Sequence, residues 1–554
     1  MVTGKKQLGS QALATAMVEG GIETIFTLAG GHFLPTYEAI GKQGRIEIVA
    51  ARHELGAGYM ASGYALATGT PGVVFSGAPG PGATNLVTPV ANAQADSIPM
   101  LVLTAQVDRR YLNRNILQYA DNVGIFNQFC KSSVQAVSAA ELPNLIATSL
   151  QIATSGRQGP VHIDLPQSLQ AESINVLESL SKAQFPINEP SGVALSGLFD
   201  LIEKSDRPAI LAGHGVIRGR GTRALGECAK VLGAPVATSR SGIGSINSAD
   251  ENSVGMLGFY GTDTAKEAIR QSDLVLVIGC ALGEQTTFGW QTDLFAPDVT
   301  IVHVDVDPKQ ANLVYPISVA FQCCAGAFLE RLKGFSKKKK RWYRKKPHPI
   351  AAANRPDNGL SAADVLQMLN FHLDDQMLVS GDIGNHRLWM CDQLRITCPE
   401  RLMQSCEFDA MGFSLPAAVG AAVANPQRRV VSISGDGGFV HTLGEMAVIK
   451  AMALPVIIIV FVDGALGILR HQAEAMWGND RYVRLEPIDF TTVANGFGIE
   501  ARKIENTDDL KDAMAWAFKK EGPCLLSVVI DPAEVFPPLK SKIEQRKKDL
   551  MTKI

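Results

Sequence analysis

Short apolar runs rich in valine, isoleucine and leucine alternate along the whole chain with longer stretches of helical periodicity. Such alternation is typical of parallel β-sheets covered by helices on both faces. We therefore predict an α/β fold in which each domain has a mostly parallel sheet flanked by helices. The apolar run from Val456 to Val462 is far shorter than the roughly 20 residues of a membrane helix, so we predict a buried strand.

Breaks in this pattern divide the chain of 554 residues into three parts. The strand-like segment before Pro166 ends at a residue that interrupts regular structure, so the first boundary is placed shortly after it. A lysine- and arginine-rich run over residues 337–346 is typical of a solvated connection to the last part. The predicted strands of the middle part cover residues 208–212, 274–279 and 300–305. The predicted domains cover residues 1–170, 190–340 and 355–554, the last with a charged, helical C-terminal tail.

The chain carries 52 lysine and arginine residues against 54 aspartate and glutamate residues, a formal net charge of −2. This balance gives no electrostatic basis for binding nucleic acid or a membrane surface, so we expect neither as a partner. Apolar residues make up 46% of the chain and charged residues 19%, which excludes a disordered protein. Nine cysteines without metal-type spacing, and an N-terminus without a signal-peptide pattern, predict a cytoplasmic protein.

The strongest chemical signal is a predicted strand that ends in glycines and one carboxylate, Gly435-Asp436-Gly437-Gly438. Here the backbone can approach an anion closely, and Asp436 can bind a divalent cation. A second apolar strand ends at Asp463, and 463 − 436 = 27 residues is the length of one strand–helix–strand crossover. Parallel neighbours would place both carboxylates at one sheet edge, where phosphate oxygens, water and a backbone carbonyl complete the octahedron that Mg²⁺ prefers. Either aspartate alone is more often a capping residue, but together they predict a diphosphate and Mg²⁺ site.

These residues resemble the thiamine diphosphate-dependent decarboxylase and carboligase superfamily, whose fingerprint is GDG followed one crossover later by a strand end containing Asn. This chain has Asp463 at the Asn position, which keeps an oxygen ligand and adds negative charge. The resemblance extends along nearly the whole chain and is closest to acetolactate synthases, with some features of benzaldehyde lyase and 2-hydroxyacyl-CoA lyases. The matching segments are Arg52–Gly58, Gly80–Asn85 and Met411–Ala418.

The resemblance implies a pyrimidine-binding, a central Rossmann-like and a diphosphate-binding domain, in this order. It implies that thiamine diphosphate and Mg²⁺ bind between the first domain of one subunit and the third of another, so we expect a homodimer or homotetramer. FAD or another nucleotide in the central domain stays open. The glycine turn at Gly213 and Gly215 lacks the standard third glycine, and the two-arginine motif of acetolactate synthases is replaced by Gly279–Gln285.

By the same resemblance, Glu54 is the catalytic carboxylate that shares a proton with the aminopyrimidine ring of the cofactor. His32 follows Ala29-Gly30-Gly31 where the family has Pro-Gly-Gly-Ala, and is either a proton shuttle or a turn residue. Gln118 is the third candidate catalytic residue, a polar position near the substrate pocket. The implied metal ligands are Asp436, Asp463 and Ala465. The implied cofactor contacts are Glu54, Asn85, Gly384, Asn385, His386, Met411, Gly435, Asp436, Gly437, Gly438, Asp463, Ala465, Leu466, Gly467 and Ile468.

The reaction implied by the resemblance is decarboxylation and carboligation of 2-keto acids, as in acetolactate synthases. A 2-hydroxyacyl-CoA or acyloin lyase is the alternative, favoured by His32 and by the loss of the two-arginine motif. Gln472, which stands where acetolactate synthases have an acceptor-pocket tryptophan, also weakens the assignment to acetolactate synthase. A non-catalytic cofactor-binding homologue is an alternative of another class, but the catalytic and cofactor residues present in one chain argue against it. The expected substrate is a small-molecule 2-keto acid, aldehyde or 2-hydroxyacyl compound.

Overall fold

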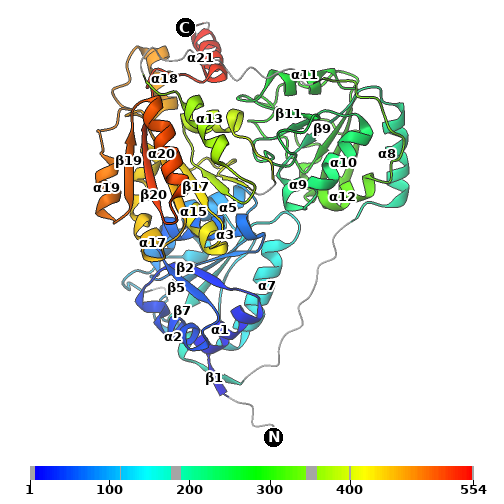
Figure 1. The fold of residues 1–554 in the computed structure, drawn as a ribbon. Coiled ribbons are helices and arrows are strands. Elements are labelled where there is room, and N and C mark those ends of the chain that lie inside the picture. Colours follow the sequence, from blue (N-terminus) through cyan, green and yellow to red (C-terminus); the bar gives the residue numbers. More distant parts are fainter. Residues whose placement is uncertain (1–5, 113, 176–188, 345–358, 399–400, 552–554) are drawn as a thin grey trace.

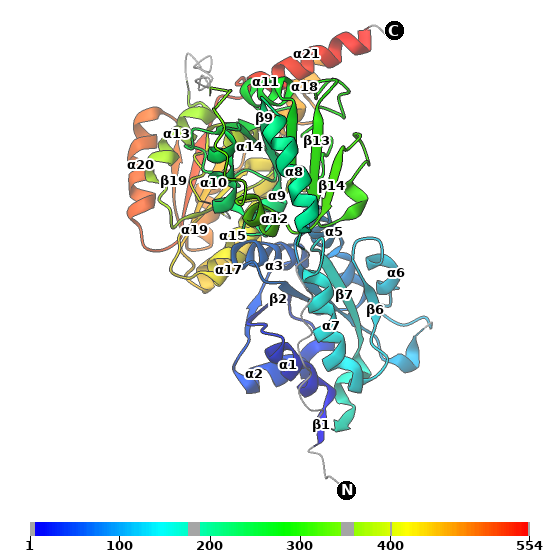
Figure 2. The same cartoon turned by 90° about the vertical axis from the view of Figure 1, so that its right-hand side faces the viewer.

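The computed structural model describes residues 6–112, 114–175, 189–344, 359–398 and 401–551. In this part of the chain, three six-stranded parallel sheets follow one another in the sequence, each flanked by helices (Figures 1 and 2). Buried apolar side chains pack against both faces of each sheet. The N-terminal domain lies below the central and C-terminal domains in Figure 1. The predicted α/β fold with three mostly parallel sheets is confirmed.

The N-terminal sheet has the strand order β3-β2-β4-β5-β7-β6. Its strands are β2 (Thr24–Leu28), β3 (Glu47–Ala50), β4 (Gly72–Ser76), β5 (Met100–Gln106), β6 (Ser133–Gln135) and β7 (Pro160–Pro166). Its helices are α1 (Gly9–Glu19), α2 (Leu34–Gln43), α3 (Glu54–Thr68), α4 (Gly80–Thr84), α5 (Val87–Ala95), α6 (Asn122–Phe126) and α7 (Leu142–Thr154). Strand β1 (Lys6–Leu8) pairs antiparallel with β8 (Ser173–Asn175), which ties the start of the domain to its end.

The central sheet has the order β11-β10-β9-β12-β13-β14. Its strands are β9 (Pro208–Ala212), β10 (Val236–Thr238), β11 (Ser253–Met256), β12 (Leu274–Ile278), β13 (Thr300–Asp305) and β14 (Val319–Gln322). Its helices are α8 (Gly192–Lys204), α9 (His214–Arg218), α10 (Thr222–Leu232), α11 (Asp263–Gln271) and α12 (Ala325–Leu332). The three strands predicted here from apolar runs are β9, β12 and β13, and they lie side by side at the centre of the sheet.

The C-terminal sheet has the order β16-β15-β17-β18-β20-β19. Its strands are β15 (Leu378–Gly381), β16 (Leu402–Gln404), β17 (Val430–Gly435), β18 (Val456–Val462), β19 (Glu500–Ile504) and β20 (Cys524–Val529). Its helices are α13 (Ala362–His372), α14 (Asn385–Gln393), α15 (Ser414–Ala424), α16 (Asp436–Val440), α17 (Met446–Ala451), α18 (Gly467–Trp477), α19 (Phe490–Gly496), α20 (Thr507–Lys519) and α21 (Pro537–Met551). Strands β17 and β18 are direct neighbours, as the crossover length predicts.

The basic stretch after α12 is only partly solvated, in contrast to what its charge predicts. The ammonium group of Lys339 donates to the carbonyl of Ile202 (2.7 Å), and the indole N–H of Trp342 donates to the carbonyl of Pro208 (2.8 Å). Tyr343 is buried in the same region of the central domain. Aromatic side chains and the aliphatic stems of lysine have apolar surface to bury, so residues 339–343 pack on the central domain. Residues 345 and 346 lie outside the described part.

Helix α21, the predicted charged tail, packs on the C-terminal domain and reaches the central one. Leu539 and Ile543 are buried in the C-terminal core. The ammonium group of Lys542 lies 3.6 Å from the ring centroid of Phe259, a cation–π contact with the central domain. In the described residues, no helix has both the length and the apolar character needed to cross a bilayer.

The N-terminal and C-terminal domains share one apolar core, built around helices α3 and α15. A Cβ atom on Gly63 of α3 would lie 2.0 Å from the carbonyl oxygen of Ala417, and one on Gly420 of α15 would lie 1.9 Å from that of Met60. Glycine on each helix thus permits backbone-to-backbone contact. This contact fixes the two domains against each other.

Gly420→Ala should therefore lower the free energy of unfolding by about 1–3 kcal/mol, the usual cost of overpacking, because α15 would have to move away from α3. Gly226→Ala in α10 is the matched control, since no heavy atom outside its own helix backbone lies within 4 Å of the added Cβ. Alanine there should leave stability unchanged or raise it by up to ~1 kcal/mol. Urea unfolding followed by circular dichroism measures both. Equal midpoints for the two variants would contradict the close packing.

Candidate active site

The carboxylate of Asp436 lies at the carboxyl end of β17, fixed by two backbone N–H groups. One oxygen accepts a hydrogen bond from the N–H of Gly437, and the other from the N–H of Gly464, each at 2.8 Å. The side chain is buried, and this desolvation raises its pKa above the usual value. Residues 435–438 are called the glycine loop below. The hydrogen bond from Gly464 to Asp436 links this loop to the end of the neighbouring strand β18.

Asp463 follows β18 and lies close enough to Asp436 for their charges to interact. Burial and the charge of Asp436 raise the pKa of Asp463 to about 6. Its carboxylate accepts from the N–H of Ala465 (3.2 Å) and forms a longer ion pair with Arg470 (3.5 Å). Two buried carboxylates that repel each other are stabilised by a shared divalent cation, so this pair is suited to hold one.

A cavity of about 270 Å³ opens beside these carboxylates in the C-terminal domain. The predicted cofactor residues of this domain all line it: Gly384, Asn385, His386, Met411, Gly435, Asp436, Gly437, Gly438, Asp463, Ala465, Leu466, Gly467 and Ile468. The walls therefore come from the ends of three adjacent strands, β15, β17 and β18, and from the helices that follow them. This is the sheet edge at which ligands of open α/β folds bind.

Polar atoms with no partner in the described structure line this cavity. The side-chain oxygen of Asn385 and Nε2 of His386 are buried and make no hydrogen bond there. Burial lowers the pKa of His386 to about 3, so its imidazole is neutral. Its ring is stacked on Phe461 at 5.8 Å and leaves no room for a side chain at Gly384. Buried polar atoms without partners are costly, and a bound polar ligand would supply the missing partners.

Asp382, which the sequence analysis missed, holds the turn that carries Met411. Its fully buried carboxylate accepts from the N–H groups of Gly412 (3.0 Å) and Ser414 (3.4 Å) at the start of α15. The Met411 methyl lies 3.5 Å from where a Cβ of Gly437 would be, so the methionine packs against the glycine loop. A carboxylate directly after a buried strand was the available signal, the same one that identified Asp436.

The candidate residues of the N-terminal domain gather at the carboxyl edge of its own sheet. Glu54, the first residue of α3, is 6% exposed, and its carboxylate accepts from the amide of Asn85 at 3.0 Å. His32 lies on a turn after β2, where burial lowers the pKa of its imidazole. The exposed Gln118 has a left-handed backbone (φ 63°), and its carbonyl accepts from the N–H of Gly80 (2.6 Å). These four residues do not line the C-terminal cavity.

Glu445 of the C-terminal domain joins the two domains at the start of α3. Its carboxylate is 1% exposed and accepts from the backbone N–H groups of Arg52 (3.0 Å) and His53 (3.1 Å), just before Glu54. Glycine at position 56 makes room for this carboxylate, because a Cβ there would lie 2.1 Å from Oε1 of Glu445. Desolvation raises the pKa of Glu445 to about 7. The sequence alone does not indicate this contact, which spans nearly 400 residues.

A second cavity, of about 610 Å³, lies where the central domain meets the other two. His214, Gly279 and Asp305 line it from the carboxyl ends of β9, β12 and β13. The N-terminal domain contributes Asp96 and the C-terminal domain contributes Glu407. The cavity therefore lies where nucleotides bind in Rossmann-like sheets.

Three family models match the chain in the order of its domains. They are the N-terminal TPP binding domain (residues 8–125), the central domain (195–332) and the C-terminal TPP binding domain (382–528) of thiamine pyrophosphate enzymes. The chain belongs to the thiamine pyrophosphate enzyme family. Thiamine pyrophosphate is another name for thiamine diphosphate, so the predicted superfamily is confirmed.

The similar curated proteins are acetolactate synthases. A probable acetolactate synthase large subunit of Methanocaldococcus jannaschii is 33% identical over 96% of this chain and 93% of its own length. The isozyme 2 large subunit of Escherichia coli is 31% identical over 96% and 97%, and the mitochondrial catalytic subunit of Saccharomyces cerevisiae is 32% identical over 94% and 80%. The chain is thus a thiamine diphosphate-dependent enzyme that forms carbon–carbon bonds, and this reading is favoured over a lyase or a non-catalytic homologue.

Glu445→Gln should lower kcat by at least tenfold, because an amide cannot accept both hydrogen bonds equally and Glu54 would lose its fixed position. Hydrogen bonds to a charged group contribute about 1.5–3 kcal/mol, which corresponds to roughly a tenfold to hundredfold change in rate. The dissociation constant for thiamine diphosphate should stay within about threefold, since Glu445 does not line the cavity formed by the predicted cofactor residues. Glu521→Gln on the surface is the control. Steady-state kinetics in which both variants match the wild type would contradict the role of Glu445.

Proposed function

We propose that the protein is an acetolactate synthase-like carboligase that decarboxylates a 2-keto acid and joins the remaining acyl group to a second carbonyl compound, using thiamine diphosphate and Mg²⁺. When bound, thiamine diphosphate supplies a carbanion-type nucleophile that adds to the keto carbon of the substrate. The observation that carries the proposal is the cavity of the C-terminal domain. It collects the glycine loop, two facing carboxylates, Met411 and buried polar atoms without partners in one place.

The chain's own residues fit the two ends of this cofactor. The backbone N–H groups of the glycine loop and the start of α14, with Asn385 and His386, would bind the diphosphate. Asp436, Asp463 and the backbone carbonyl of Ala465 would hold Mg²⁺, which offsets the charge of both carboxylates and of the diphosphate. Met411 would support the bend between the two rings of the cofactor.

Glu54 would exchange a proton with the ring nitrogen of the aminopyrimidine, and Asn85 orients its carboxylate. Because Glu54 does not line the cavity of its own chain, the proposed partner is a second copy of the protein, which brings its N-terminal edge to this cavity. The proposed assembly is a homodimer or a homotetramer. His32 and Gln118 lie on the same edge and are proposed to face the substrate.

We further propose that the central cavity takes a nucleotide, either FAD or an ADP-like molecule. Its size, the glycine backbone at the end of β12 and the carboxylate of Asp305, which suits a ribose hydroxyl, support this. Mass spectrometry of the small molecules released from the denatured protein identifies the nucleotide. The cytoplasmic location stays a prediction from cysteine usage.

The direct test is incubation with pyruvate, thiamine diphosphate and Mg²⁺, followed by mass spectrometry for carbon dioxide and the condensed hydroxy-keto acid. Pyruvate should be consumed only when the cofactor is present. The panel includes a second 2-keto acid and several aldehydes as partners for pyruvate. Absence of a condensed product with every partner would contradict the proposed function.

Glu54→Gln should lower turnover by roughly 10²–10⁴-fold, the usual contribution of a general acid–base group. The amide keeps the shape of the side chain but cannot carry the proton. Binding of thiamine diphosphate should be largely retained, as measured by thermal shift. Glu38→Gln, an exposed position in α2 of the same domain, should behave as wild type. Turnover of Glu54→Gln within a few-fold of that control would remove Glu54 from this role.

Asp436→Ala should abolish Mg²⁺-dependent retention of thiamine diphosphate, because it removes a metal ligand and the bond that links Gly464 to the glycine loop. Isothermal titration with the cofactor, with and without Mg²⁺, measures this. Asp512→Ala on the exposed face of α20 is the control. The same Mg²⁺-dependent affinity in both variants would exclude the proposed metal site.

A further inference from the structure

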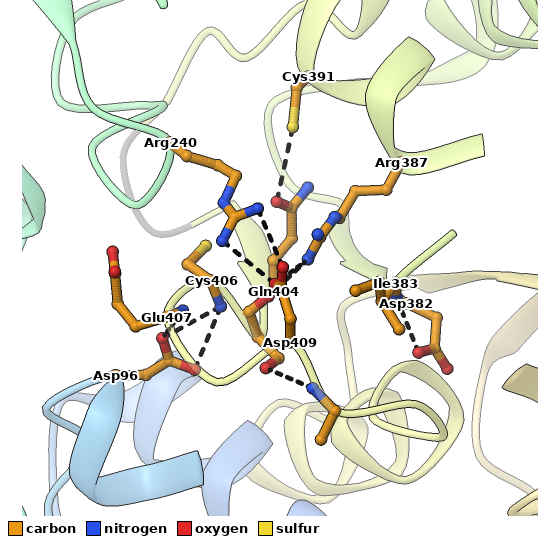
Figure 3. Close-up of polar contacts among 12 residues, drawn as sticks. Asp96, Arg240, Asp382, Ile383, Arg387, Cys391, Gln404, Cys406, Glu407 and Asp409 are labelled. Carbon is orange, nitrogen blue, oxygen red and sulfur yellow. Dashed lines mark hydrogen bonds and ion pairs between the residues drawn. The ribbon is translucent and has the colours of Figure 1, made fainter. Parts of the chain in front are cut away.

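The segment 405–409 carries Glu407, which lines the central cavity, and Asp409, which lines the C-terminal cavity. Two arginines from different domains bind this segment (Figure 3). Arg387 of α14 donates to the carbonyl of Ser405 (2.7 Å) and to the carboxylate of Asp409 (2.8 Å). Arg240, from the loop after β10 in the central domain, forms an ion pair with the same carboxylate at 3.1 Å. Asp409 is therefore fixed from both sides.

The carboxylate is the part of this trio that faces the cofactor cavity. The side chains of Arg240 and Arg387 are only 9% and 3% exposed, whereas that of Asp409 is 30% exposed, and Asp409 lines the cavity two residues before Met411. Asp409 also has a left-handed backbone with φ 56°, a conformation that residues other than glycine rarely adopt. Such strain persists where neighbouring contacts hold it, and it is found often at functional sites.

Two more carboxyl groups, those of Asp96 and Glu407, interact electrostatically with Arg240, although burial raises the pKa of Asp96 to about 7. The carboxylate of Asp96 accepts from the backbone N–H groups of Cys406 (3.0 Å) and Glu407 (2.8 Å), next to Arg240. Asp96 and Glu407 both line the central cavity. Of these charged groups, Asp409 is the one that lines the cavity of the C-terminal domain.

We propose that Asp409 determines the second substrate of the carboligation by disfavouring a 2-keto acid and favouring a neutral aldehyde or ketone. The inference rests on the proposed function. The first 2-keto acid loses its carboxylate as carbon dioxide, so selection falls on the second substrate, which keeps whatever charge it carries. Like charges repel, and a neutral carbonyl compound avoids this cost.

The test is a competition with pyruvate as first substrate and equal concentrations of 2-ketobutyrate and propanal as second substrates. Mass spectrometry gives the ratio of the keto acid product to the aldehyde product. The wild type should favour the aldehyde product. Asp409→Asn keeps the shape and removes the charge, and it should raise the ratio at least tenfold, or about 1.4 kcal/mol. Arg240→Gln removes one arginine but keeps the carboxylate, so it should not raise the ratio.

A double variant, Asp409→Asn with Arg240→Gln, removes one charge of each sign and should raise the ratio as Asp409→Asn does. It keeps the test valid if Asp409→Asn alone folds poorly. An unchanged ratio in both variants that lack the carboxylate would overturn the proposal. An equal rise in Arg240→Gln would also overturn it, because the effect would then come from the loss of the bridge between domains. Absence of any condensed product from wild type would overturn the proposed function, and this inference with it.

Discussion

The contact between the N-terminal and C-terminal domains is the constraint on which the positions of the catalytic groups depend. Helices α3 and α15 meet backbone to backbone through Gly63 and Gly420, and the buried carboxylate of Glu445 binds the residues that start α3. Glu54 is the next residue after these, and Met411 lies on the turn that leads into α15. One junction thus positions both Glu54, the carboxylate proposed to exchange the proton, and Met411, which lines the cavity proposed to bind the cofactor.

The parts of the site that could be predicted from sequence depend on local rules. A buried parallel strand is a continuous apolar run, and a glycine or carboxylate directly after it lies at the ligand-binding edge of the sheet. This is why Asp436, Asp463 and the glycine loop could be found, and why the central strands β9, β12 and β13 were predicted within one residue. The resemblance to a family then supplied Glu54, whose local sequence is that of an ordinary helix.

The parts that could not be predicted depend on partners far apart in the chain. Glu445 binds backbone N–H groups 392 and 393 residues away, and Asp409 is held by an arginine of another domain, Arg240. A lone glutamate or aspartate carries no pattern that reveals such a partner. The basic run after α12 was predicted to be solvated because of its charge. Part of it packs on the central domain instead, through its aromatic residues and the aliphatic stem of lysine.

The junction through Glu445 has a consequence for the proposed homodimer, in which one chain would contribute to two catalytic centres. In the proposed homodimer, Glu54 of one copy serves the cavity of the other copy, while Glu445 of the same chain lies nine residues after its own Asp436 (445 − 436 = 9). Each chain would then contribute residues to both centres. The hydrogen bonds of Glu445 hold the start of α3 against η6 (Leu443–Glu445), so this one contact would support groups that belong to two different centres.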